Sequence, residues 1–216
     1  MKKEVFSAVL EQHSEIIERI RQSAHVLHNS VNQTYGKDLP YGFHLDMVAD
    51  EVREFGYLVC VSEDDVVPML FGAYYHDSIE DARLTYNNVM KAARQYMNGE
   101  QALMATEIVY ALTNDKGRTR AERAGEKYYA GIRATPYAPF LKLCDRVANI
   151  TFSCSSSDAD NMRMKEIYKQ EVPHFLEAIN PHSNDPRLDV PSELVIQIAE
   201  QVIDEMQREE WIKGIG

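Results

Sequence analysis

Residues 74–81 read Tyr-Tyr-His-Asp-Ser-Ile-Glu-Asp, and they follow a nearly continuous apolar run over residues 66–74. A run of this kind suggests a buried helix, which we expect to begin near Asp65 and to end near residues 79–81. The acidic residues just before the run suit the positive end of a helix dipole. The helix would therefore carry a histidine and three acids from the interior of the protein to its last turn.

In that helix, His76 and Glu80 would share a face at spacing i,i+4, and so would Asp77 and Asp81. Three acidic groups on one turn repel one another, and a cation bound among them would relieve that repulsion. A solvated acidic helix end is the simpler interpretation. The apolar run argues against it, because a His-Asp pair carried into the interior needs a partner. The stretch alone leaves a metal site and a solvated helix end equally open.

Composition places the chain among ordinary globular proteins. It has 216 residues, of which 44% are hydrophobic and 26% charged, and we expect one domain over residues 1–216. The formal net charge of -11 argues against general nucleic-acid binding. No apolar run reaches the length of a membrane span, so we expect no membrane partner. The N-terminal residues lack a signal-peptide pattern, which favours a cytoplasmic protein.

The cysteines and one basic region refine this picture. Cys60, Cys144 and Cys154 show no paired-ligand spacing and fit buried thiols in a reducing compartment. Residues 116–146 hold eight Lys or Arg and only three acids. A solvated helix face explains most of these cations. A basic region beside an acidic metal site would also suit a phosphorylated small molecule.

Apolar spacing predicts helices along most of the chain and no clear strand. The expected helical segments lie at residues 4–32, 44–59, 65–81, 85–97, 100–113, 120–133, 140–150, 159–179 and from about 192 onward. Pro173 is expected to kink or split its segment. The fold should be an all-α bundle of roughly seven to ten helices. The apolar face of the last helix, which ends near Trp211, could pack on its own domain or on a second subunit, so a homo-oligomer stays open.

Polar residues that are expected to face inward come from three of these helices. His44 heads the apolar face of its helix, and Asp145 sits inside the apolar segment 140–150. Together with His76 and Asp77 they offer two imidazoles and two carboxylates, which suit Mn²⁺, Fe²⁺, Co²⁺ or Zn²⁺. A buried salt bridge from Asp145, for instance to Arg146, is the structural alternative. The other histidines of the first helical segment are interpreted as surface or packing residues: they are His13, His25 and His28.

The order of these residues resembles the signature of the HD superfamily of metal-dependent phosphohydrolases. Four segments narrow the resemblance to the RelA/SpoT-type alarmone hydrolases and their small stand-alone members, similar to the metazoan SpoT homologues. The segments are Pro40-Tyr41-x-x-His44, the string from His76 to Asp81, Leu112 to Lys116 with Arg120-Ala-Glu-Arg123 after it, and Lys142-x-x-Asp145-Arg146-x-x-Asn149. They occur in the family's order over about residues 40–150. Residues 159–216 would then form closing helices that pack on this core.

The resemblance implies one Mn²⁺ ion and hydrolysis of the 3′-pyrophosphate of (p)ppGpp, the nucleotide of the stringent response, to GDP or GTP and pyrophosphate. It assigns His44, His76, Asp77 and Asp145 to the metal. Glu80 and Asp81 match the family's acidic pair, which positions and activates the attacking water. Such a metal lowers the pKa of water and polarises a phosphoryl oxygen, and a nearby carboxylate can take the proton. The residues that would meet the substrate are Asn149 and, more weakly, Lys142, Lys116 and Arg146.

Two departures bear on the choice of nucleotide. The family usually carries an Arg-Lys pair a few residues before its first histidine, whereas only Lys37 remains here in the segment 35–38. His44 is followed by Leu45, where a proline is common. A hydrolase for another nucleotide, such as NADPH or a nucleoside phosphate, therefore stays open. A nucleotide-binding regulator without activity is the third hypothesis, and the retained Glu80 and Asp81 speak against it.

Overall fold

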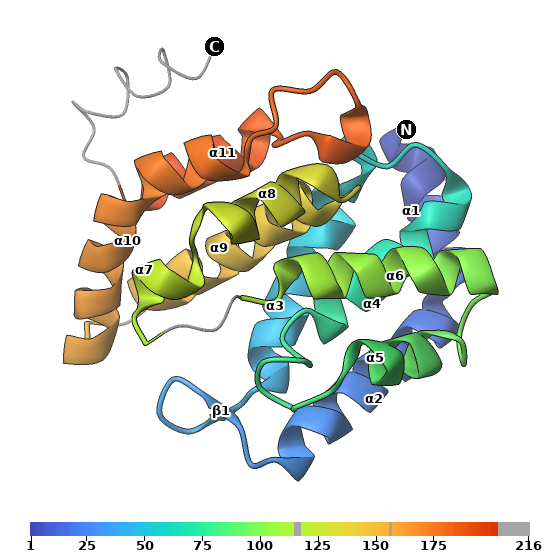
Figure 1. The fold of residues 1–216 in the computed structure, drawn as a ribbon, viewed down its shortest axis with the longest axis horizontal. Coiled ribbons are helices and arrows are strands. Elements are labelled where there is room, and N and C mark those ends of the chain that lie inside the picture. The colour runs from blue at the N-terminus through green and yellow to red at the C-terminus, as the bar shows by residue number, and fades with distance from the viewer. Residues whose placement is uncertain (115–117, 156, 203–216) are drawn as a thin grey trace.

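Helices make up nearly all of the ordered secondary structure in the computed structural model, which describes residues 1–114, 118–155 and 157–202 (Figure 1). The α-helices are α1 (Lys3–Gln12), α2 (Ser14–Ser30), α3 (Gly42–Phe55), α4 (Val66–Tyr75), α5 (Tyr86–Ala93), α6 (Gly99–Leu112), α7 (Arg120–Arg123), α8 (Glu126–Ala134), α9 (Ala138–Cys154), α10 (Ala159–Ile179) and α11 (Ser192–Val202). Short 3-10 helices lie at Gly56–Leu58, Glu63–Asp65 and Pro186–Leu188. All of these helices except α7 and the 3-10 turns have eight residues or more. The predicted all-α bundle is confirmed.

Two buried helices form the centre of the fold. Every residue of α4 is buried, as the apolar run predicts, and Pro68 lies in its first turn, where a missing N–H costs no hydrogen bond. α4 packs against α2, α3 and α6, while α9 packs against α3, α10 and α11. Figure 1 shows α9 running through the middle of the molecule, beneath α11. One connected hydrophobic cluster reaches from Phe6 to Ile198. The expected last helix is described as α11 up to Val202, and the stretch from there to Trp211 lies outside the described residues.

The central helix ends earlier than its sequence predicts. α4 stops at Tyr75, and residues 76–81 form a series of turns. The Nδ1 atom of His76 lies 2.8 Å from the carbonyl oxygen of Ala73. If the helix continued, that oxygen would accept a hydrogen bond from the backbone N–H of Asp77. A side chain that bonds to its own backbone in this way competes with helix continuation. The backbone N–H of Asp81 still donates to the carbonyl of Asp77 at 2.9 Å, so the acids stay close together.

Two other helical predictions also need correction. The segment 4–32 is not one helix, because the backbone leaves helical geometry at His13 (φ -102, ψ 13). The break lets α1 pack against α4 and the 3-10 turn at Gly56–Leu58, while α2 packs against α3 and α4. Pro173 does not split its segment, because α10 runs unbroken through it from Ala159 to Ile179, and the alternative of a kink stays a prediction.

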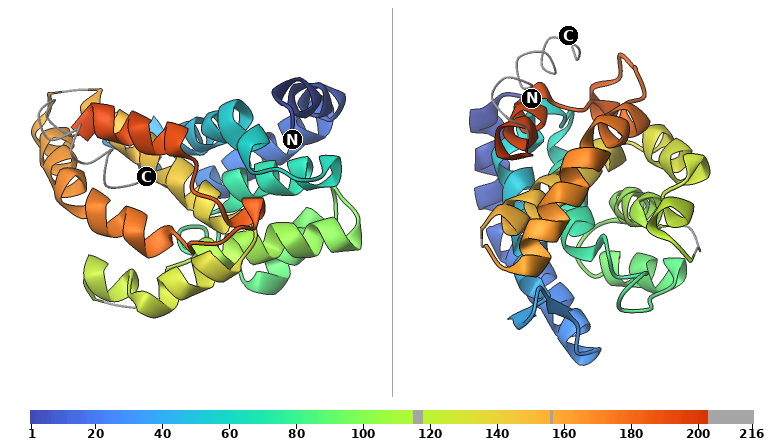
Figure 2. Two further views of the ribbon diagram at one scale, coloured as in Figure 1. Left: turned by 90° about the horizontal axis from the view of Figure 1, so that it is seen from above. Right: turned by 90° about the vertical axis from the view of Figure 1, so that its left-hand side faces the viewer.

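A small hairpin replaces part of the loop expected before His44. Strands β1 (Thr34–Tyr35) and β2 (Leu39–Pro40) pair antiparallel, with Thr34 opposite Pro40. The expectation of no strand is wrong here, because two-residue strands are too short to show a sequence period. Gly36 takes φ +60 in the turn, and a Cβ on it would lie 2.8 Å from the ring of Phe152. The hairpin projects beside the end of α2 (Figure 2).

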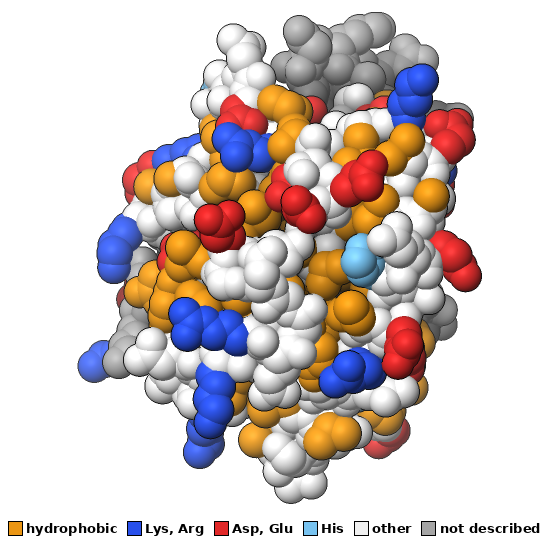
Figure 3. All heavy atoms as spheres, turned by 90° about the vertical axis from the view of Figure 1, so that its right-hand side faces the viewer, with side chains coloured by type: hydrophobic (Ala, Val, Ile, Leu, Met, Phe, Trp, Pro, Cys, Tyr) orange, Lys and Arg blue, Asp and Glu red, His pale blue; other side chains and the backbone are white. Residues whose placement is uncertain are grey.

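The surface carries mixed charge. On the face that Figure 3 shows, the described acidic and basic side chains are interspersed with hydrophobic ones. Among the described residues, no helix is both long and apolar enough to cross a bilayer.

Candidate metal centre

Three elements bring the predicted ligands together. His44 lies in the first turn of α3, His76 and Asp77 directly follow α4, and Asp145 lies in the middle of α9. Because α3 packs against both α4 and α9, side chains on the facing sides of these helices must meet. Residues more than 100 positions apart in sequence thus share one place in the fold.

The facing atoms of these side chains lie within a few ångströms of one another. Nε2 of His44 is 3.3 Å from Nε2 of His76 and 3.2 Å from Oδ1 of Asp145. Asp77 Oδ2 lies 2.9 Å from Nε2 of His76 and 3.8 Å from that of His44. Ligands bound at about 2.1 Å around a single ion are about 3.0–3.4 Å apart in regular geometry. His44, His76 and Asp145 each place one donor atom within 4.8 Å of the others, as ligands of one ion would, and Asp77 borders this group through His76.

Backbone and ring contacts fix the two imidazoles. Because a carbonyl oxygen only accepts, the Nδ1 atom of His76 must donate to Ala73, which directs Nε2 toward the other ligands. The ring of Tyr35 stacks on His44, with centroids 4.7 Å apart and planes at 23°. If neither buried ring carried a proton on Nε2, these two atoms, 3.3 Å apart, would repel as acceptors. A proton or a cation between them removes that repulsion, so the donor set fits a metal ion.

Electrostatics at the site favour positive charge. Burial alone would lower the pKa of His76, but the carboxylates of Asp77 and Asp145 raise it to about 9. Burial would raise the pKa of Asp77, yet the neighbouring His76 holds it below its usual range. The same holds for Asp145, whose low pKa is due mainly to Lys142 beside it. Without metal, the cluster therefore retains a proton in place of a cation.

Several outer contacts orient the carboxylates. The ammonium of Lys142 lies 2.9 Å from Oδ2 of Asp145, and the amide of Asn149 donates to Oδ1 of the same carboxylate at 2.6 Å. Asn149 in turn accepts a hydrogen bond from the hydroxyl of Tyr35 at 3.0 Å. The hydroxyl of Tyr41 donates to Oδ2 of Asp77. Asp145 does form the buried salt bridge of the structural alternative, with Lys142 as its partner in place of Arg146.

Glu80 and Asp81 lie beside this cluster, each held by an amide. Glu80 accepts from the backbone N–H of Asn114 at 2.5 Å and from its side chain at 3.0 Å. Asp81 accepts from the side chain of Gln33 at 2.5 Å. Burial raises the pKa of both carboxyl groups, and the negative charge of Asp77 adds to the effect. Both acids are therefore closer to the range in which a carboxylate exchanges protons near neutral pH.

A cavity of about 670 Å³ opens over the cluster, within the range of small-ligand sites. Its walls include three of the four predicted ligands, the acidic pair and three of the predicted substrate contacts: these are His44, Asp77, Asp145, Glu80, Asp81, Lys142, Arg146 and Asn149. Arg146 is engaged elsewhere as well. It pairs with Glu171 at 2.8 Å and lies 4.3 Å from the centre of the Phe175 ring.

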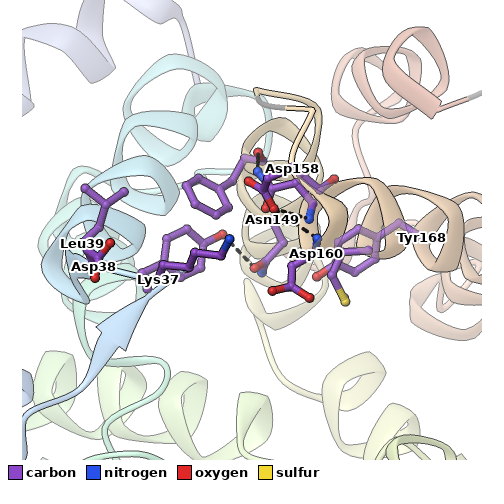
Figure 4. A pocket seen from close by; sticks show the side chains of 13 residues that line it. Lys37, Asp38, Leu39, Asn149, Asp158, Asp160 and Tyr168 are labelled. Atoms are coloured by element: carbon purple, nitrogen blue, oxygen red, sulfur yellow. Dashed lines mark hydrogen bonds between the residues drawn. The ribbon is translucent and has the colours of Figure 1, made fainter.

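A second cavity of about 510 Å³ lies next to the first, and Asn149 and Tyr168 border both. Figure 4 shows Lys37, Asp38 and Leu39 on the hairpin side, facing Asn149, Asp158, Asp160 and Tyr168 on the other. Lys37 is thus placed away from Lys142 and Arg146, in this second cavity. Lys116 lies outside the described residues.

Three residues that contact the candidate ligands and acids have no role predicted from the sequence: Tyr35, Tyr41 and Gln33. Such residues are hard to recognise from sequence, because a tyrosine or glutamine in a loop is uncharged and belongs to no helical or strand periodicity. No family model and no curated protein sequence matches this chain.

Proposed function

We propose that the chain is a metal-dependent phosphohydrolase that removes the 3′-pyrophosphate of (p)ppGpp, as its resemblance to the alarmone hydrolases implies. The supporting observation is the cluster of His44, His76 and Asp145, with Asp77 beside it, next to a cavity whose walls also hold two further acids. A cavity of about 670 Å³ has room for a nucleotide.

We assign Mn²⁺ as the ion, with another divalent transition metal as the alternative. When bound, it would lower the pKa of water and polarise a phosphoryl oxygen. His44 and His76 would contribute neutral Nε2 atoms, which their ring contacts direct inward. Asp77 and Asp145 would contribute carboxylate oxygens, and their negative charge offsets that of the ion.

Glu80 and Asp81 are the groups that hold the water and take its proton. They face the cavity beside Asp77, and burial raises the pKa of each. A carboxylate with a raised pKa is a better proton acceptor than a fully solvated one.

Contacts to substrate come from Asn149, Lys142 and Arg146 in the first cavity and from Lys37 in the second. Lys142 and Arg146 each already pair with an acid, so their charge is partly balanced. We expect them to orient substrate and ligands more than to attract the substrate from a distance. Self-association and a cytoplasmic location stay predictions of this proposal.

Hydrolysis of a different nucleotide is the second candidate, and the second cavity favours it. Among its described lining residues, Lys37 is the one cation, and Asp38, Asp158 and Asp160 are acids. An acidic rim with a single lysine differs from the Arg-Lys pair usual in the family, and would select another base or a differently charged group.

The experiment incubates the purified protein with Mn²⁺ and ppGpp and follows pyrophosphate. We expect release in the wild type that is lost in Asp77→Ala and Glu80→Ala. Asp50→Ala is the matched control, because Asp50 is an exposed acid on α3 that pairs only with nearby Arg53 among the described residues.

Three outcomes separate the hypotheses. Pyrophosphate release that survives Asp77→Ala would contradict the site. No release from ppGpp, but turnover in a panel of NADPH and nucleoside phosphates, would favour the second candidate. A protein that binds no metal and turns over no nucleotide would overturn both enzyme proposals.

A further inference from the structure

A chain of hydrogen bonds reaches Asp81 from a helix that supplies no ligand. His28 on α2 is fully buried (0% exposed), and its Nδ1 atom lies 3.0 Å from Oε1 of Gln33. The Nε2 atom of Gln33 lies 2.5 Å from Oδ2 of Asp81. A residue interpreted from sequence as packing or surface is thus two hydrogen bonds away from the cavity wall.

The chemistry of the three groups fixes the direction of both bonds. A carboxylate accepts, so the amide nitrogen of Gln33 must face Asp81 and its oxygen must face His28. His28 must then donate from Nδ1. Burial lowers the pKa of His28, which favours the neutral ring with its proton on Nδ1. Tyr41, which contacts Asp77, stacks on this ring with centroids 4.8 Å apart and planes at 17°.

Asp81 needs such a restraint. It lies at the end of the turns that follow α4, and the negative charge of Asp77 opposes its own. Glu80 has its own holder, because both of its oxygens accept from Asn114. Two separate amides therefore hold the two acids, with Tyr41 as a further partner of Asp81, and the amide of Gln33 can be removed without touching that of Asn114.

We propose that Gln33, oriented by His28, is a positioning residue that sets the direction in which the Asp81 carboxylate faces the cavity. The inference rests on the proposed function, because it matters for turnover only if Asp81 handles the attacking water. Gln33 itself contacts none of the four predicted metal ligands through the hydrogen bonds and ion pairs of the described residues.

The test compares Gln33→Met with wild type, because methionine keeps the length of the side chain and removes its donor. With Mn²⁺ and ppGpp we expect kcat to fall about 100-fold, the effect of misplacing a catalytic group by roughly an ångström. KM should stay within about threefold, because ground-state binding is untouched. Mn²⁺ affinity should match wild type, while Tm should fall slightly because the buried ring of His28 loses its acceptor. Gln22→Met is the control, since Gln22 is an exposed glutamine on α2 that pairs with Glu18.

A second readout is independent of activity: the ¹⁵N NMR shifts of His28 report which ring nitrogen carries the proton. We expect the Nδ1–H tautomer in wild type and its loss in Gln33→Met. Unchanged kcat in an active protein, or a loss of Mn²⁺ affinity as large as the loss of kcat, would overturn the positioning role. A wild type that turns over no nucleotide defeats the proposed function alone. In that case the tautomer of His28 still tests the hydrogen-bond chain from His28 through Gln33 to Asp81. The Nδ1–H tautomer supports this chain, and the Nε2–H tautomer overturns it.

Discussion

Two imidazole nitrogens face each other at the centre of the site, and their contact decides what the site can hold. The Nε2 atoms of His44 and His76 are 3.3 Å apart, with Asp77 and Asp145 beside them. Such a set binds either a proton or a cation, and the two compete. The predicted metal ligands are therefore also the residues whose proton content should change when metal binds.

Mn²⁺ binding should release close to one proton at pH 7, because metal must displace the proton of His76, whose pKa the carboxylates raise to about 9. The release should decline as pH rises through about 9, where the metal-free ring is already neutral. Calorimetric titration in two buffers with different heats of ionisation measures the number of protons. A binding heat independent of buffer at pH 7 would contradict the arrangement.

The same raised pKa has a consequence for the stability of the metal-free protein. A histidine with a folded pKa above its unfolded value adds stability at low pH, and this contribution is lost as pH rises through about 9. Removing the metal should therefore lower the free energy of unfolding more above about pH 9 than below it.

At the scale of elements, apolar spacing was enough to locate most helices, and local polar contacts decided where they ended. The buried character of α4 follows from its apolar residues, but its end at Tyr75 depends on the His76 side chain taking the carbonyl of Ala73. The hairpin before α3 could not be predicted, because its strands are two residues long and its turn depends on contact with Phe152.

A substitution at Gly72 tests how tightly α4 packs against its neighbours. The position of His76 depends on that packing, because His76 directly follows α4. A Cβ on Gly72 would lie 2.7 Å from a methyl carbon of Ile108 and 2.8 Å from one of Leu141. Gly72→Ala should therefore destabilise the protein by about 1–3 kcal/mol, the usual cost of overpacking a core. Urea denaturation with and without Mn²⁺ measures this loss.

Gly131 supplies the matched control in the middle of α8, because nothing lies within 4 Å of a Cβ placed there. Gly131→Ala should raise stability by about 0.5–1 kcal/mol through helix propensity alone. Equal effects of the two substitutions would show that α4 is not packed as closely as described.

At the scale of the whole molecule, the site exists only because α3, α4 and α9 meet. The sequence could point to the candidate ligands, since a histidine or aspartate in or next to an apolar helix is conspicuous. It could not identify what holds them, because Tyr35, Tyr41 and Gln33 come from the hairpin region and approach the site only in the folded chain. Nor could it place Lys37, which lines a second cavity beside Asn149.

We propose that His44, His76, Asp77 and Asp145 hold one divalent ion. Diffraction from crystals grown with Mn²⁺, recorded at the manganese absorption edge, tests it directly. We predict one strong anomalous peak at about 2.0–2.3 Å from Nε2 of both histidines and from an oxygen of each aspartate. No peak among these four side chains at saturating Mn²⁺, or a peak only elsewhere on the protein, would contradict the account.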